Sequence, residues 1–203
     1  MAAIEHIVLD VGRVLIHWDP EIPYKRLIPD PEERQYFLSE VCSPAWNLEQ
    51  DRGRPFAEAE QVLVAEHPVY EPLIKAYRTH WMEMIPHPIL GSMEIMAELI
   101  DGGTDVTLLT NFSQETFPLA QSRFPTLSRA RGVTVSGEIG LLKPDLEIYR
   151  HHHDSFGLDP AATVFFDDSP KNVDGAKAAG WQAFLFTSAE KMRQDMQGLG
   201  VKI

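Results

Sequence analysis

The hydrophobic pattern changes character twice along the chain. A short apolar run from Ile4 to Leu9 predicts a first strand. From about residue 18 to residue 88, apolar residues recur at three-to-four spacing, which is typical of amphipathic helices. Beyond Pro88, short apolar runs that predict strands alternate with periodic segments that predict helices. This alternation favours a parallel sheet with helices on both faces.

The predicted elements divide the chain into two parts. After Pro88, strands are predicted over 106–109, 132–136, 163–166 and 182–186. Helices are predicted there over 89–100, 115–124, 145–156, 170–179 and 189–199. The earlier stretch predicts helices over 31–42, 55–66 and 69–84, and no strand. We therefore expect an α/β fold: a Rossmann-like three-layer core with a parallel sheet, residues 1–15 and 89–203, and an inserted helical cap, residues 16–88.

Composition limits the kinds of partner. The formal net charge of −12 argues against a nucleic-acid or anionic-membrane surface, since both favour basic proteins. Cys42 is the only cysteine, so no intramolecular disulfide can form and a cytoplasmic location is expected. We expect no signal peptide, and no apolar run approaches transmembrane length. The expected partner is a small molecule, and the protein itself is expected to be a monomer or a homodimer.

Polar residues follow three of the predicted strands. Asp10 ends the first strand, Thr110 and Asn111 end the second, and Asp167 and Asp168 end the strand that begins at Thr163. In open α/β sheets, ligands bind outside the carboxyl ends of the strands. Adjacent buried acids repel each other unless a cation or hydrogen bonds compensate for their charge. The pattern indicates one site at this edge of the sheet, with a hard cation.

Four motifs in chain order carry a family resemblance: Asp10-Val-Gly-Arg-Val-Leu15, Leu108-Leu-Thr-Asn111, Lys143-Pro144 and Phe166-Asp-Asp-Ser-Pro-Lys-Asn172. Together they resemble the four motifs of the haloacid dehalogenase-like hydrolase superfamily, over nearly the whole chain. The insertion after the first strand is similar to the helical cap of its subfamily I. The Asp-x-Gly-x-Val motif resembles a subgroup that includes sugar-1-phosphate phosphatases. The resemblance implies a phosphatase acting on a small phosphorylated metabolite.

The resemblance also implies roles for the residues that match its motifs. Asp10 would be the nucleophile that forms an aspartyl-phosphate. The Thr110 hydroxyl and the Asn111 backbone N–H would donate to a phosphoryl oxygen, and Lys143 would neutralise the nucleophile and the phosphate.

A magnesium site is implied as well, because Mg²⁺ prefers oxygen ligands. Asp10, the backbone carbonyl of Gly12 and Asp168 would hold the ion. Asp167 and Asn172 would lie outside its ligands and orient them.

Gly12 departs from the family pattern. Many phosphatases of the superfamily carry a second Asp at this position, which protonates the leaving oxygen and then activates water. General acid–base help of this kind is worth about 10²–10⁴-fold. Without it, the rate is expected to depend steeply on the leaving group, unless His17, Asp19 or Asp51 of the cap region provides the proton.

Two alternatives to a phosphatase stay open at this stage. A 2-haloacid dehalogenase, acting through an Asp10 ester without metal, needs no acid because halide leaves without a proton. Relatives with that activity resemble this chain in part, but they carry serines where Asp167 and Asp168 stand here. The other alternative is a non-catalytic module that binds a phosphate ligand.

Further side chains are assigned less directly. Arg13, Trp18 and Trp46 are candidate substrate contacts, although both tryptophans also fit simple helix packing. Trp181 is expected in the core. The tract His151-His-His153 lies in a predicted helix and is expected to be a solvated surface. Lys171 and Asp174 are also expected to be solvated.

Overall fold

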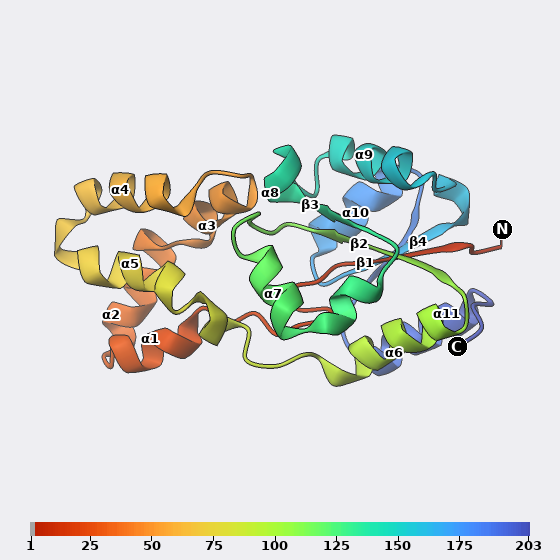
Figure 1. Cartoon of the computed structure of the whole chain (residues 1–203), viewed down its shortest axis with the longest axis horizontal. Helices are drawn as coiled ribbons and strands as arrows, with labels where there is room; N and C mark the ends of the chain where they lie inside the picture. Colours follow the sequence, from red (N-terminus) through yellow and green to blue (C-terminus); the bar gives the residue numbers. More distant parts are fainter. Residues whose placement is uncertain (1–2) are drawn as a thin grey trace.

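A five-stranded parallel sheet forms the centre of the protein in the computed structural model, which describes residues 3–203 (Figure 1). The strands are β1 (His6–Leu9), β2 (Asp105–Thr110), β3 (Val133–Val135), β4 (Thr163–Asp167) and β5 (Gln182–Leu185). They lie in the order β3-β2-β1-β4-β5. Because β1 pairs in parallel with both β2 and β4, the carboxyl ends of these three strands meet. This is the point at which α/β sheets bind ligands.

Alternate residues of each strand enter different hydrophobic clusters. Ile7 and Leu9 belong to a large cluster on one face of the sheet, while Val8 between them belongs to a second cluster on the other face. The same holds in β4, where Phe165 lies in the second cluster and Phe166 in the first. Burial on both faces explains why these strands appear in the sequence as continuous apolar runs.

Helices cover both faces of the sheet (Figure 1). One face carries α6 (Leu90–Asp101), α7 (Phe117–Arg123) and α11 (Ala189–Gly198), and the other carries α9 (Leu146–Phe156) and α10 (Pro170–Ala178). Shorter turns complete the connections: η4 (Pro125–Arg129), α8 (Ser136–Ile139) and η5 (Pro160–Ala162). The expected α/β fold is confirmed. Within residues 3–203, no helix combines the length and the apolar composition needed to cross a membrane.

Residues 16–88 contain helices and turns beyond the carboxyl ends of the strands (Figure 1). They are α1 (Glu21–Leu27), α2 (Pro31–Tyr36), η1 (Phe37–Val41), α3 (Pro44–Asp51), α4 (Phe56–Glu66), η2 (Pro68–Tyr70), α5 (Glu71–Thr79) and η3 (Trp81–Met84). Two isolated bridges pair Ile16 with Gly12 and with Pro88, but this stretch contributes no strand to the sheet. We call residues 16–88 the cap.

The two linkers between core and cap run side by side. The backbone N–H of His17 donates to the carbonyl of His87 at 3.1 Å, and that of Ile89 donates to Leu15 at 2.8 Å. The Arg123 guanidinium of the core also donates to two carbonyls at the end of the cap. Because both linkers leave the core at one place, we place the division between core and cap here. Movement of the cap about this pair of linkers stays a prediction.

Two predicted cap helices are interrupted in the structure. The helix predicted over 69–84 is divided into η2, α5 and η3. Pro72 accounts for the first break, because it stands in the first turn of α5 and has no N–H to continue an earlier helix. The helix predicted over 31–42 changes at Phe37 from α-helix to a π-helical turn that ends at Val41. Both differences lie in the cap and leave its helical character unchanged.

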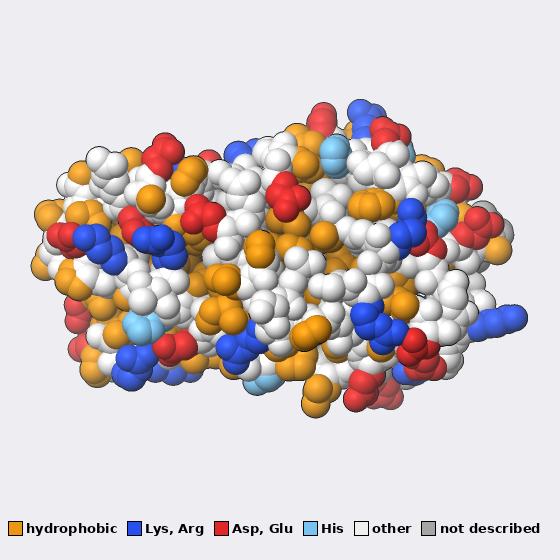
Figure 2. Space-filling view, in the orientation of Figure 1, with side chains coloured by type: hydrophobic (Ala, Val, Ile, Leu, Met, Phe, Trp, Pro, Cys, Tyr) orange, Lys and Arg blue, Asp and Glu red, His pale blue; other side chains and the backbone are white. Residues whose placement is uncertain are grey.

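Charged side chains on the face shown in Figure 2 are mixed in sign. Acidic and basic residues are interspersed over both the cap and the core, and this face carries no continuous basic region.

The expectation of a solvated histidine tract is wrong for its middle residue. His152 is fully buried between α9 and the sheet. Its Nε2 is hydrogen-bonded to the Thr107 hydroxyl at 2.9 Å and its Nδ1 to the Thr134 hydroxyl at 2.8 Å. A neutral imidazole donates from one nitrogen and accepts at the other, so two hydroxyls satisfy it completely. Burial accordingly lowers the pKa of His152 to about 3.

Buried His152 gives the fold a defined pH dependence. In the unfolded chain, His152 takes up a proton as the pH falls below 6.5, the ordinary pKa of histidine. In the folded protein, the His152 side chain stays uncharged until about pH 3. The free energy of unfolding therefore decreases as the pH is lowered through this window. Between pH 7 and pH 5, wild type should lose about 2 kcal/mol more unfolding free energy than His152→Gln in urea titrations. The exposed neighbour variant His151→Gln should keep the wild-type slope, and an unchanged slope in His152→Gln would refute the assignment.

Candidate active site

Asp10 stands at the carboxyl end of the central strand β1. Its side chain is nearly buried, with the residue only 6% exposed. One carboxylate oxygen, Oδ1, accepts from the Val11 backbone N–H at 2.7 Å and lies 2.8 Å from the Lys143 ammonium. Asp10 is thereby held in one orientation at the wall of a cleft between core and cap.

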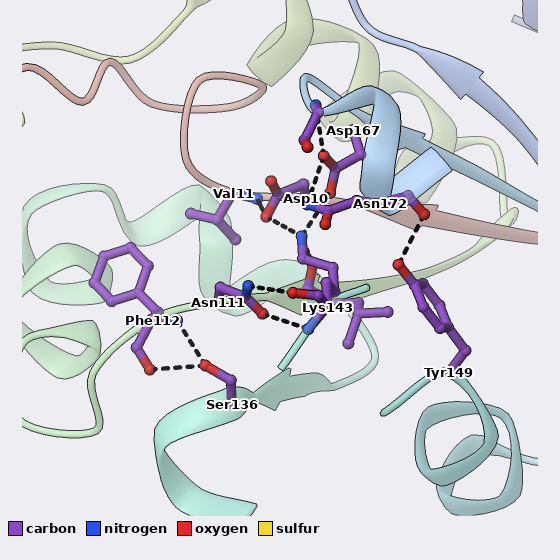
Figure 3. A network of polar contacts seen from close by, with 11 residues as sticks. Asp10, Val11, Asn111, Phe112, Ser136, Lys143, Tyr149, Asp167 and Asn172 are labelled. Carbon is purple, nitrogen blue, oxygen red and sulfur yellow. Dashed lines mark hydrogen bonds and ion pairs between the residues drawn. The ribbon is translucent and has the colours of Figure 1, made fainter. Parts of the chain in front are cut away.

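Lys143 connects the acids of the site (Figure 3). Its buried ammonium contacts Asp10 at 2.8 Å and Asp167 at 2.6 Å, and donates to the Leu109 carbonyl at 3.0 Å. An ammonium has three protons to donate, so these three acceptors use all of them. Asn111 holds the backbone of Lys143 from both sides: its Oδ1 accepts from the Lys143 N–H and its Nδ2 donates to the Lys143 carbonyl.

The adjacent acids Asp167 and Asp168 have different surroundings. Asp167 is fully buried, and it accepts from the Ser169 backbone N–H at 2.8 Å, from the Asn172 amide at 2.9 Å and from Lys143. Asp168 has a side chain that is 30% exposed, and its nearest cation is Arg13 at 4.0 Å. The protein therefore satisfies Asp167 internally and leaves Asp168 facing the cleft.

The three acids carry more negative charge than Lys143 can balance. Asp10, Asp167 and Asp168 each present an oxygen within 4.8 Å of the others. Burial is the largest influence on Asp10 and raises its pKa to about 7, although Lys143 opposes this shift and Asp167 adds to it. Burial and then Asp167 also raise the pKa of Asp168. A divalent cation would remove this repulsion, so the arrangement of oxygen donors fits a magnesium ion.

Two neighbouring spaces lie between cap and core. The cleft has a volume of about 320 Å³, and its walls include Asp10, Lys143 and Asp168 of the core. An inner cavity of about 80 Å³ is more apolar, and Trp81 and Phe112 are among its walls. Five residues line both spaces: Gly12, Trp18, Asn47, Asp51 and Asn111.

The structure separates the side chains that the sequence analysis proposed for the cleft. Arg13 and Trp18 line it. Trp46 instead lies inside the cap, with its ring 6.2 Å from Phe56 and 5.1 Å from Tyr77. Tyr77 of α5, which no sequence motif singled out, also lines the cleft. No local signal distinguishes an aromatic residue at the edge of a core from one at its centre.

The three proposed proton donors also differ in position. His17 is exposed, and its ring lies 4.1 Å from that of His87. Asp19 accepts from the Glu21 backbone N–H at 2.9 Å in the first turn of α1. Neither is among the residues that line the cleft or the inner cavity, whereas Asp51 lines both.

A parallel sheet with acids at its switch point and a helical cap defines the class of protein. Residues 50–186 match the family model of haloacid dehalogenase-like hydrolases, and the chain belongs to this family. Among curated proteins, it is 31% identical to sesquiterpene phosphatase astK of Aspergillus oryzae over 95 residues, which cover 47% of this chain and 48% of that protein. The matched regions span about half or less of the length of the curated relatives.

Solved structures share the fold at low sequence identity. HAD family enzyme bt-2542 from Bacteroides thetaiotaomicron, in complex with magnesium and inorganic phosphate, gives a TM-score of 0.72 at 22% identity, covering 92% of this chain and 96% of that one. L-2-haloacid dehalogenase from Xanthobacter autotrophicus gives 0.65 at 16% identity, covering 98% and 85%. At these identities the comparison shows a common fold, so the choice between activities depends on the site.

Proposed function

We propose that the protein is a magnesium-dependent phosphatase that hydrolyses a small phosphomonoester through an aspartyl-phosphate on Asp10. The observation that carries this proposal is the cluster of three acids around one buried lysine, with Asp10 oriented toward the cleft. A carboxylate held in this way suits nucleophilic attack on phosphorus. The named phosphatase relative and the neighbour with magnesium and phosphate support the same reaction class.

The metal would be held by Asp10, the backbone carbonyl of Gly12 and Asp168. Gly12 and Asp168 line the cleft together with Asp10, and the ion pair of Asp168 with Arg13 is long, at 4.0 Å. Asp167 accepts hydrogen bonds from Lys143 and Asn172, so it would orient these side chains without binding the ion. When bound, magnesium supplies positive charge that stabilises the phosphoryl oxygens as charge develops on them.

The remaining groups would position the substrate around Asp10. The Thr110 hydroxyl and the Asn111 backbone N–H would donate to a phosphoryl oxygen, at the end of the strand next to β1. Lys143 would keep Asp10 ionised and aimed, because its ammonium protons are already bonded to protein oxygens. The Asn111 side chain supports this role by clamping the backbone of Lys143.

As the substrate, we propose a sugar phosphate. Trp18 lines both spaces, and its ring lies 5.7 Å from that of Trp81. Asn47 and Thr116 add polar groups to the same inner cavity. Aromatic faces with a few convergent polar groups are a common lining for small-molecule sites. A screen of sugar, aryl and alkyl phosphates tests this choice of substrate.

The dehalogenase alternative is disfavoured by the charge of the site. Asp167 and Asp168 beside Asp10 would repel a carboxylate substrate and gain nothing from a metal-free reaction. The deciding assay compares hydrolysis of an aryl phosphate with and without Mg²⁺ against chloride release from 2-chloropropionate. Magnesium-dependent phosphate release with no chloride release is expected. Chloride release without metal would replace the proposal, and turnover in neither assay would favour a binding module.

The metal assignment predicts different effects for the two adjacent acids. Asp168→Asn should weaken Mg²⁺ binding at least about tenfold, because even partners outside the coordination sphere change metal affinity about 10–100-fold. Asp167→Asn should instead lower stability, by about 1–3 kcal/mol, because both oxygens of this fully buried carboxylate accept hydrogen bonds and an amide replaces one acceptor with a donor. Calorimetry with Mg²⁺ measures the first effect and urea unfolding the second.

Asp174→Asn is the control for both measurements, since Asp174 is an exposed acid on α10. It should match wild type in affinity and stability. Loss of Mg²⁺ binding in Asp167→Asn with retention in Asp168→Asn would reverse the assignment of the two acids.

A further inference from the structure

The position of Gly12 leaves room beside the nucleophile. A Cβ atom built on Gly12 would meet no atom within 4 Å, although the residue lines both the cleft and the inner cavity. The space where a second acid could stand is therefore open, and a proton donor has to reach it from elsewhere. The cap faces this space, so its titratable side chains are the ones to consider.

Asp51 is the carboxylic acid that the cap places there. It is the last residue of α3 and lines the cleft with Asp10, while also sharing the inner cavity with Gly12. Within residues 3–203, Asp51 takes part in no ion pair of its side chain. It thus differs from Asp10 and Asp167, which are both tied to Lys143.

A chain of hydrogen bonds orients the Asp51 side chain. The Asn47 amide donates to Asp51 Oδ2 at 3.0 Å, and the Tyr77 hydroxyl donates to Asn47 Oδ1 at 3.1 Å. Both supporting residues belong to the cap and line the cleft. Among residues 3–203, Asn47 is the side chain that engages the Asp51 carboxylate, and the backbone N–H of Ser113 also interacts with it.

The backbone of Asp51 is attached to the core. The Ser136 hydroxyl of α8 donates to the Asp51 carbonyl and accepts from the Phe112 backbone N–H at 2.9 Å. Nearby, Gly53 adopts φ +112°, and a Cβ there would come within 2.8 Å of the Gly137 carbonyl. In Figure 1, α3 and α8 lie next to each other. One serine therefore joins Asp51 to the loop that follows Asn111, on the phosphate side of the cleft.

The surroundings of Asp51 also suit proton transfer near neutral pH. Burial raises its pKa to about 7, opposed only by the backbone of Ser113. A carboxyl group with a pKa near the working pH can both give and take a proton.

We propose that Asp51 is the general acid and base of the reaction, provided by the cap in place of the side chain that Gly12 lacks. This inference rests on the proposed phosphatase function. In the first step an Asp10 oxygen attacks phosphorus, the bond to the leaving oxygen breaks, and that oxygen takes the proton of Asp51. In the second step the Asp51 carboxylate takes a proton from water, whose oxygen attacks phosphorus. The bond to Asp10 then breaks, inorganic phosphate leaves, and Asp51 is again protonated.

The test is Asp51→Asn with phosphate esters of graded leaving-group pKa at saturating Mg²⁺. Wild type should depend little on the leaving group. For alkyl phosphates, the variant should lose about 10²–10⁴-fold in kcat/KM, the usual contribution of a general acid. For 2,4-dinitrophenyl phosphate, whose leaving group needs no proton, it should release about one equivalent of phenolate in a burst. Slow turnover should follow, because hydrolysis of the aspartyl-phosphate has lost its base.

Asp19→Asn is the matched control, because Asp19 is a cap acid outside both spaces whose turn an asparagine also supports. It should behave as wild type with every ester. If Asp51→Asn loses the same factor with all leaving groups and shows no burst, or loses nothing, Asp51 is not the acid and the phosphatase function stands. If wild type has no magnesium-dependent turnover, or if Asp10→Asn keeps it, the proposed function fails and this inference fails with it.

Discussion

Asp10→Asn is expected to lower phosphatase turnover by about 10⁴-fold or more while the protein stays folded. The amide is a poor nucleophile, so the aspartyl-phosphate cannot form. The fold should tolerate the change, because Lys143 keeps Asp167 and the Leu109 carbonyl as partners. The variant also removes one of three neighbouring acids, so its melting temperature without metal should equal or exceed that of wild type. Phosphate release and thermal unfolding measure the two effects.

Asp174→Asn provides the control for this variant as well, since it makes the same chemical change on an exposed part of α10. It should retain full turnover. Retention of more than a few per cent of activity by Asp10→Asn, after deamidation has been ruled out by mass spectrometry, would mean that phosphorus is attacked by another group. The covalent mechanism would then have to be abandoned, even if the enzyme remained a magnesium-dependent phosphatase.

Lys143→Met is expected to reduce both turnover and stability. The substitution keeps the apolar stem but leaves Asp10 and Asp167 buried without their cation. Removing one partner of a buried ion pair costs about 3–5 kcal/mol, and turnover should fall by about 10³-fold as Asp10 loses its orientation and its negative charge. Urea unfolding and steady-state kinetics at several Mg²⁺ concentrations measure these losses. Lys171→Met, an exposed substitution on α10, should change neither quantity.

A double variant separates the pairing from the individual residues. In Asp10→Asn/Lys143→Met the unpaired acid at position 10 is gone, so the double variant should be less destabilised than Lys143→Met alone. The part that remains reports the contact between Lys143 and Asp167 at 2.6 Å. Strictly additive losses would show that Asp10 and Lys143 do not interact in solution, against the contact in the structure.

The order of elements in the core could be predicted from the sequence because each element carries its own local pattern. Apolar runs such as Thr163–Phe166 predicted strands, and their burial on both faces is why they are continuous. The candidate acids were predictable for a related reason. A carboxylate directly after a buried strand can lie only at the carboxyl edge of the sheet, and parallel strands bring those edges together. The sequence therefore placed Asp10 and Asp168 at the same edge of the sheet.

Contacts across the site needed the tertiary structure. The sequence could not show that Asp167 is held by Lys143, 24 residues away along the chain, while Asp168 faces the cleft. Nor did local pattern reveal that Asn111 clamps the Lys143 backbone from 32 residues away. Each depends on which side chains of separate elements arrive within hydrogen-bond distance. Helical and strand periodicities describe one element at a time and carry no information about that distance.

Burial of polar residues on helices was also decided by packing alone. Polar composition assigned the histidine tract to the solvated side of its helix, but His152 is buried because distant partners compensate for its burial. Thr107 and Thr134 of two strands provide that compensation here. Asp51 became the favoured proton donor for the same reason: the cap folds back so that Ser136 of the core holds its backbone above the cleft. The sequence determined the residue types and the ends of the strands. The contacts between cap and core form only when both have folded, so they could not be predicted from local pattern.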